Sequence, residues 1–73
     1  MREANKMTER FLRLTEVMEK VGLRRSAIYD KISRREFPAP VKIGSASRWL
    51  ASEVAAWMDE MVQDRGEEYR EAG

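Results

Sequence analysis

The amino-acid sequence predicts one small, mainly α-helical domain that carries a short β-hairpin. Three observations support this fold class: two short helical patterns separated by Gly22, an alternating apolar and basic segment after residue 40, and a long amphipathic stripe near the C-terminus. A chain of 73 residues has room for a single small core. We predict a flexible lead over residues 1–10, the folded domain over residues 11–65 and a polar, acidic, partly disordered tail over residues 66–73.

The first helix is predicted to be short, covering residues 16–21. It follows an apolar entry at residues 11–14, which has the character of an extended segment. Thr15 is the expected N-cap, because its hydroxyl can accept a hydrogen bond from an unpaired backbone N–H. Glu16 and Glu19 place negative charge at the positive end of the helix dipole. Gly22 is the expected stop, since glycine adopts the left-handed conformation without a Cβ penalty.

A second helix is predicted from Arg24 or Arg25 to Arg34. Leu23, Ile28 and Ile32 mark its apolar face. Only a very tight, glycine-containing link separates it from the first helix. This arrangement is typical of a helix-turn-helix.

A β-hairpin is expected to follow the second helix. Pro38 and Pro40 end the helix, because proline lacks the backbone donor and restricts the preceding residue to extended geometry. Residues 41–43 alternate apolar and basic as a half-buried strand does, residues 44–47 are small and form the turn, and residues 48–50 return as the second strand. Trp49 and Leu50 are adjacent on a strand, so only one of them can face the core.

The third predicted helix begins near Ser52, its expected cap, and is stopped by Gly66. Its apolar residues recur at helical spacing and form one stripe that we expect to pack on the core: Val54, Trp57, Met58 and Met61. The order helix, tight turn, helix, basic hairpin, helix is that of a winged helix-turn-helix.

The composition argues against several classes of function. The sequence contains no cysteine and no histidine, which removes the usual zinc, iron and copper ligands, the commonest general base and the commonest soft nucleophile. No glycine-rich phosphate loop or nucleophile motif is present. We therefore expect neither an enzyme nor a cofactor, and no small-molecule substrate. No segment has the length of a membrane span or the form of a signal peptide, so we expect a cytoplasmic protein without a membrane partner.

The charge distribution points to a polyanionic partner. Residues 1–50 hold 12 Lys and Arg against 6 Asp and Glu, a balance of +6, whereas residues 51–73 hold 2 against 7, a balance of −5. The two balances give the net charge of +1 for the whole chain. A basic body with an acidic C-terminal part is expected when one face meets nucleic acid, although two solvated charge clusters would give the same count.

The start of the second helix supplies the first candidate DNA contacts. In a helix-turn-helix the N-terminal residues of the second helix lie nearest to the base edges in the major groove. Arg25 and Arg24 can each bond guanine in bidentate fashion, or only follow the phosphates. Ser26 can bond a phosphate or a base, or serve the first helical turn. Tyr29 can contact sugar, phosphate or a thymine methyl group, or pack against the turn.

Further basic residues extend the candidate interface. Lys31, Arg34 and Arg35 form a basic patch towards the end of the second helix, where they also complement the helix dipole. Asp30 would repel phosphates, so we expect it to pair with Arg34 four residues later. On the hairpin, Lys42 and Arg48 are expected to face phosphates of a neighbouring groove.

Four short elements follow one another between residues 13 and 57: "GL" before "RSAIY", then "FPAPVKIG", the "RW" of the second strand, and "SEVAAW". In their order and spacing, this stretch resembles the AlpA family of prophage regulators. The resemblance implies a MerR-like winged helix-turn-helix and a role in prophage or mobile-element control. It implies a transcription regulator, or an excision factor that bends DNA beside an integrase site.

The resemblance also implies which residues bind DNA. Arg25, Ser26 and Tyr29 match the recognition helix, and the wing is matched by Lys42, Ser45, Ser47 and Arg48. The sequence departs from the family at Arg24, where a serine or threonine usually caps the helix. Arginine cannot cap in that way, which puts the start of the helix and the role of Arg24 in doubt.

Two functional hypotheses remain. In the first, the protein binds double-stranded DNA in a sequence-specific manner, with several copies side by side because one small domain buries little DNA surface. In the second, it is a protein-interaction module whose third helix, with Met58 and Met61, docks an integrase or a polymerase subunit. The two can coexist.

Overall fold

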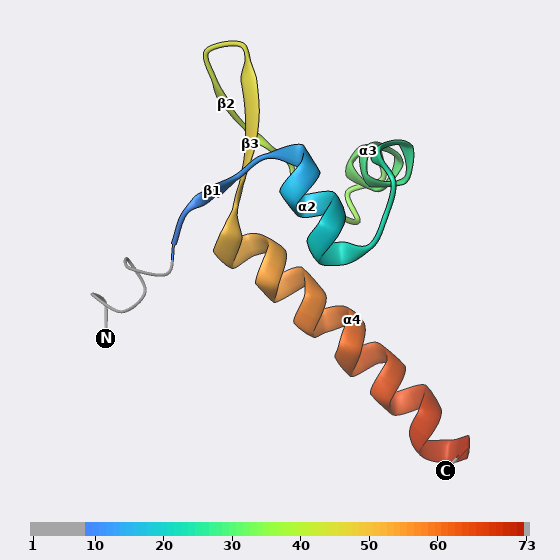
Figure 1. Cartoon of the computed structure of the whole chain (residues 1–73). Coiled ribbons are helices and arrows are strands. Elements are labelled where there is room, and N and C mark those ends of the chain that lie inside the picture. Colours follow the sequence, from blue (N-terminus) through green and yellow to red (C-terminus); the bar gives the residue numbers. More distant parts are fainter. Residues whose placement is uncertain (1–8, 73) are drawn as a thin grey trace.

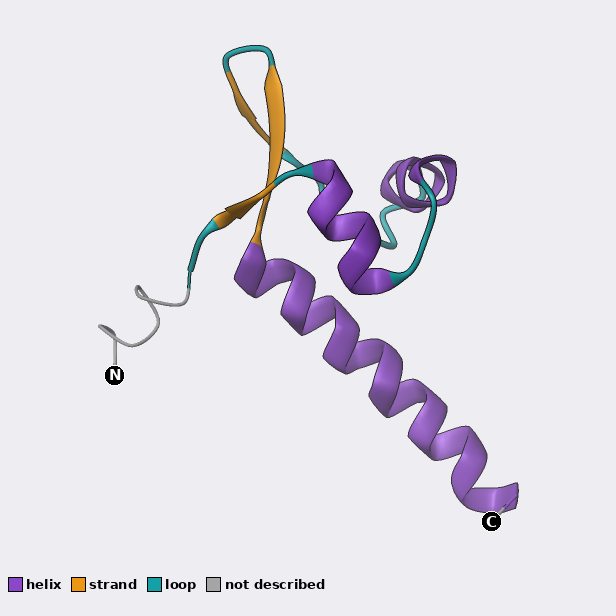
Figure 2. Cartoon of the chain, in the orientation of Figure 1, coloured by secondary structure: helices purple, strands orange, loops and turns teal. Residues whose placement is uncertain are grey.

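The computed structural model describes residues 9–72 and confirms the predicted fold class (Figure 1). Within these residues, three helices and a small antiparallel sheet form a winged helix-turn-helix (Figure 2). The elements in chain order are β1 (Phe11–Leu12), α2 (Leu14–Val21), α3 (Arg25–Ser33), β2 (Val41–Ile43), β3 (Ala46–Leu50) and α4 (Ala51–Ala72). Of the predicted lead, residues 1–8 lie outside the described residues.

The sheet has three strands in the order β1-β3-β2, so the apolar entry at residues 11–12 adds a strand to the predicted hairpin. Phe11 pairs with Leu50 and Leu12 with Trp49, while Lys42 pairs with Ser47. Residues directly opposite each other share a face, and neighbours along a strand point to opposite faces. The sheet therefore has an inner face, which includes buried Leu12 and Trp49, and an outer face.

The core is entirely apolar and draws one buried side chain from each described element except β2, and one from the loop between α3 and β2. Its buried residues are Leu12, Val17, Ile28, Phe37, Trp49 and Val54. Trp49, not Leu50, faces the core, and its indole Nε1–H donates to the backbone oxygen of Pro38 at 3.0 Å. No described buried side-chain nitrogen or oxygen lacks a hydrogen-bond partner, so this small core carries no unpaired polar group.

The stripe on α4 packs as predicted over its first half. Val54 is fully buried, and Trp57 and Met58 lie partly buried against the core. The ring of Trp57 meets the ring of Phe37 edge-on at 4.8 Å between centroids, and its Nε1–H donates to the backbone oxygen of Glu36 at 2.7 Å. Met61, in contrast, is 40% exposed. The stripe therefore continues beyond the core and into solvent.

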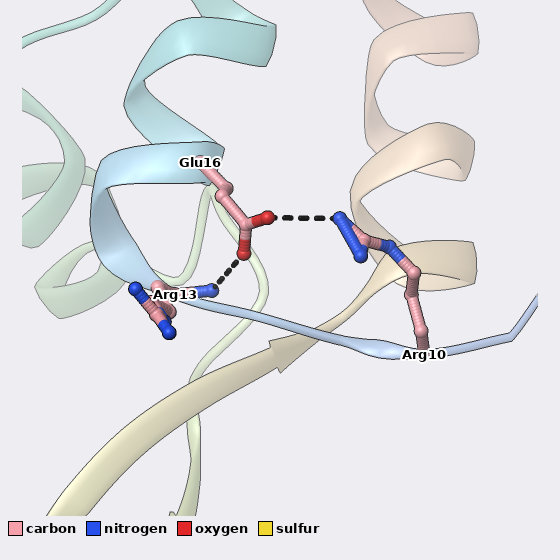
Figure 3. A network of polar contacts seen from close by, with 3 residues as sticks. All are labelled: Arg10, Arg13 and Glu16. Atoms are coloured by element: carbon pink, nitrogen blue, oxygen red, sulfur yellow. Dashed lines mark hydrogen bonds and ion pairs between the residues drawn. The ribbon is translucent and has the colours of Figure 1, made fainter.

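The cap predicted for the first helix is wrong. α2 begins at Leu14, so Thr15 lies inside its first turn and Arg13 is the N-cap residue. The carboxylate of Glu16 accepts a hydrogen bond from the Arg13 backbone N–H at 2.8 Å and also binds the Arg10 guanidinium at 2.9 Å (Figure 3). A carboxylate three residues into the helix thus supplies the capping contact that we assigned to a hydroxyl.

The bounds predicted for the last helix are also wrong. α4 begins at Ala51, directly after β3, so Ser52 lies within the helix. The Ser52 backbone N–H and hydroxyl both donate to the carboxylate of Glu9, at 3.1 and 2.8 Å. Glu9 and Arg10 are therefore held in place, since the Arg10 backbone oxygen also accepts from the Ala51 N–H. The predicted stop at Gly66 is contradicted, because the helix continues to Ala72.

The predicted turns hold with one adjustment. Gly22 is left-handed, with φ of 73°, and its N–H donates to the Met18 oxygen as a helix-ending glycine does. The hairpin turn contains only Gly44 and Ser45, because Ala46 pairs with Ile43 and already belongs to β3. Gly44 has φ of 63°. Two-residue hairpin loops favour glycine where φ is positive.

We expect the Glu16→Gln variant to lose stability at neutral pH but not in acid. The backbone N–H of Arg13 holds the pKa of Glu16 below its ordinary value, and the charges of Arg10 and Arg13 act in the same direction. A lowered folded-state pKa stabilises the fold above the unfolded-state pKa, and this contribution disappears as the pH falls through the folded-state value. Urea denaturation of both proteins across this range measures the difference.

Glu19→Gln is the matched control, since Glu19 is exposed on the same helix and makes no hydrogen bond or ion pair with another described residue. A pH-independent difference between Glu16→Gln and the parent protein would contradict the assigned role of the carboxylate.

Candidate nucleic-acid interface

The start of α3 presents its polar side chains to solvent. Arg24 occupies the N-cap position with extended backbone angles, φ −84° and ψ 165°, and its side chain makes no capping hydrogen bond. Arg25 and Ser26 follow in the first turn, and all three residues are exposed. The first turn contains no acidic residue. The unpaired backbone N–H groups and the two guanidinium groups therefore give this helix end a positive potential.

Tyr29 lies one turn further along α3 and serves the fold as well as the surface. Its ring meets the buried Trp49 ring edge-on at 6.2 Å between centroids, yet 40% of the residue remains exposed. The two roles considered for Tyr29 are thus compatible, because one edge packs on Trp49 while part of the side chain reaches solvent.

The three basic residues predicted to form a patch at the end of α3 differ in their surroundings. Arg34 pairs with Asp30 at 3.2 Å, as expected from their spacing. Lys31 is half-buried and lies about 140° around the helix axis from Ser26 and about 160° from Tyr29. Arg35 follows the helix in a left-handed conformation with φ of 62° and is exposed. Of these residues, Arg34 has its charge balanced by Asp30, and Lys31 lies on the side of the helix opposite to Ser26 and Tyr29.

The hairpin separates two cations that we expected to act together. Lys42 and Ser47 are paired on the inner face, where the Lys42 Nζ donates to the Ser47 Oγ at 3.0 Å. Arg48 is paired with Val41 and therefore points to the outer face. Its Nη1 donates to the Ser47 backbone oxygen at 2.9 Å. Ser45 is exposed in the turn.

The outer face of the sheet carries apolar residues that sequence reasoning missed. Val41 and Ile43 were expected to be half-buried, but they are 37% and 48% exposed, and Phe11 is 48% exposed. The reason is geometric: the β2–β3 hairpin extends beyond the helices, so none of the described helices covers this face of it (Figure 1). The alternation of Val41, Lys42 and Ile43 signalled two different faces, but it could not show that both lie outside the core.

In the described part of the chain, no group of three or more His, Cys, Asp or Glu residues is placed to hold a metal ion. None of the described helices combines the length and the apolar character needed to cross a membrane.

The fold and the exposed basic helix define a winged helix-turn-helix protein. Residues 10–62 match the family described as "Prophage CP4-57 regulatory protein (AlpA)". The chain is also 48% identical over 62 residues to "Uncharacterized protein ORF88" of Enterobacteria phage P4, an alignment that covers 84% of this chain and 70% of that protein. No solved structure matches. The chain belongs to the AlpA family, a regulatory, DNA-binding family of phage type.

Proposed function

We propose that this protein binds double-stranded DNA sequence-specifically, with α3 in the major groove. The observation that carries the proposal is the exposed N-terminal end of α3, where Arg24, Arg25, Ser26 and Tyr29 reach solvent from a helix anchored by buried Ile28. The major groove admits one helix, and arginine and serine are side chains that read base edges there. Anchoring through the core fixes the helix backbone from which these side chains project before DNA arrives, which lowers the ordering cost of binding.

The hairpin is the proposed second contact. Lys42 lies on the same sheet face as Trp49, whose ring contacts Tyr29 of α3. Lys42, Ser45 and Ser47 are therefore assigned to phosphates next to the groove that α3 occupies. Arg48 lies on the opposite face of the hairpin. It contacts DNA only when the hairpin lies inside a groove, with phosphates next to both faces. Lys31, Arg34 and Arg35 contribute long-range attraction more than direct contacts.

The biological role proposed is regulation of prophage genes, prophage excision, or both. The same recognition and bending of DNA serves a promoter and a recombination site. In either role the protein acts in the cytoplasm of the host, on the DNA itself.

We expect selective retention of a few loci when the protein is incubated with sheared host genomic DNA at about 0.15 M salt and the retained fragments are sequenced. Direct repeats beside an integration site would support excision, and a promoter would support transcription control. With about five phosphates neutralised, log K should fall against log salt with a slope near −4 to −5. Retention equal to that of random fragments, or a slope near zero, would contradict DNA recognition.

A protein-docking role is the second candidate, and one observation favours it. A groove between residues 35–39 and α4 is lined by aromatic and acidic residues. None of its lining residues comes from the N-terminal end of α3. In this role an integrase or a polymerase subunit docks on α4, with Met58 and Met61 as apolar contacts. Charge reversal at Arg25 and Lys42 separates the two functions, because it should abolish DNA retention and leave a docking function intact.

A further inference from the structure

We propose that copies of this protein associate head to tail, with the outer face of the hairpin of one copy seated in the groove beside α4 of the next. The placement of copies side by side on DNA rests on the proposed function. The contact between two copies does not require DNA and can be measured without it. The proposal comes from two exposed surfaces of one chain that complement each other in polarity and charge.

The first surface is the groove between the 35–39 segment and α4, with a volume of about 740 Å³. Its floor is aromatic, formed by Phe37 and Trp57, and exposed Met61 extends it along α4. Three carboxylates line it, those of Glu36, Glu53 and Glu60, against the single cation Arg35. The groove therefore fits a ligand that is apolar at its centre and basic around it.

The second surface is the outer face of the hairpin, and it has this chemistry. Val41 and Ile43 are exposed there, and Arg48 is paired directly opposite Val41. A hairpin is narrow, and it projects from the helices where no other described element covers it (Figure 1). Exposed apolar residues flanked by a cation match a groove of aromatic residues flanked by carboxylates.

The geometry favours a neighbouring copy over closure within one molecule. The hairpin and α4 extend in different directions from the junction between β3 and α4 (Figure 1), so one copy cannot seat its own hairpin in its own groove. Two different surfaces then meet, which makes the contact heterologous and leaves a free hairpin and a free groove at the ends of a row. Lys42 and Ser47, on the inner face, remain available to DNA.

The association is expected to be weak in free solution. A hairpin tip buries less than the roughly 800 Å² per partner of a stable complex. Adjacent DNA sites would raise the effective concentration of one copy beside another and so convert a weak contact into cooperative binding.

Disulfide trapping tests the contact cleanly, because the chain has no cysteine of its own. One copy carries Ile43→Cys and the other Glu60→Cys, and the two are mixed without DNA under mild oxidation. We expect at least about five-fold more mixed disulfide than from two matched control pairs, as the higher effective concentration of the seated pair requires. The first control replaces Ile43→Cys by Lys42→Cys, on the opposite face of the hairpin. The second replaces Glu60→Cys by Asp59→Cys, an adjacent exposed position outside the groove.

Charge exchange provides the second measurement. Arg48→Glu in the hairpin copy should lower the yield of mixed disulfide about two- to five-fold, as loss of an exposed ion pair implies. Position 60 carries the cysteine in the trapping pair, so the compensating change is Glu53→Arg in the groove copy, which should restore the yield.

Equal yields from the test pair and both control pairs would overturn the proposal, whatever the result of the genomic DNA experiment. Circular dichroism of each variant checks whether all of them have the same helix content as the parent protein.

Discussion

Arg25→Ala is expected to weaken specific DNA binding about 5- to 150-fold, which corresponds to about 1–3 kcal/mol for a bidentate contact with a base. Arg25 is exposed in the first turn of α3, next to an N-cap residue that contributes no capping side chain. Its guanidinium makes no hydrogen bond or ion pair with another described residue, so the substitution removes the proposed DNA contact without breaking an internal one. Fluorescence anisotropy with a labelled fragment recovered from genomic DNA measures the change.

Two further variants tell how Arg25 acts. Arg25→Lys keeps the charge but loses the two-pronged geometry, so it should bind as weakly as Arg25→Ala if the residue reads a base, and nearly as well as the parent protein if it contacts phosphate. Lys20→Ala removes the same charge from the side of α2 that faces α4, where Lys20 lies beside Ala51 and Met58. An affinity for Arg25→Ala no lower than that of Lys20→Ala would refute a direct role for Arg25.

Trp49→Ala is expected to destabilise the fold by about 3–5 kcal/mol. Trp49 is the largest fully buried side chain, and its ring lies against Tyr29 while its Nε1–H binds the Pro38 oxygen. The whole unfolding free energy of a chain of this size is about 4–11 kcal/mol. The variant should therefore lose from about a quarter of its unfolding free energy to all of it, which urea denaturation followed by circular dichroism would measure.

Trp49→Phe is the matched variant, since it keeps an aromatic ring in the core. It loses the hydrogen bond to Pro38 and part of the ring volume, and we expect a smaller loss of about 1–2 kcal/mol. Unchanged urea midpoints for both Trp49 variants would show that this tryptophan does not organise the core.

The contact between α3 and β3 at Trp49 links stability with the proposed function. Tyr29 of α3 contacts Trp49 of β3, and β3 also leads directly into α4. A substitution at Trp49 is therefore expected to displace α3 and the hairpin together. DNA-binding losses in Trp49 variants should be interpreted only after their folded fraction has been measured.

The order of the elements and most of their apolar faces could be predicted from the sequence alone. Helix ends are marked by local backbone restrictions at Gly22, Pro38 and Pro40. These restrictions need no tertiary partner to act. The 48% identity to a phage P4 protein and the family match over residues 10–62 agree with the resemblance drawn from four short motifs. The Asp30–Arg34 pair was likewise foreseeable, because residues four apart on a helix are always neighbours.

Contacts between residues far apart in the sequence could not be predicted from local patterns. Local reasoning assigned caps to Thr15 and Ser52 because their hydroxyls are the usual local solution, but Glu16 and Glu9 supply carboxylates, the latter from 43 residues away. Lys42 and Arg48 looked equivalent in the sequence, yet strand register places them on opposite faces of the hairpin. Val41 and Ile43 have the pattern of buried residues but lie beyond the core. Periodicity specifies which residues share a face, whereas what covers that face depends on where the rest of the chain is packed.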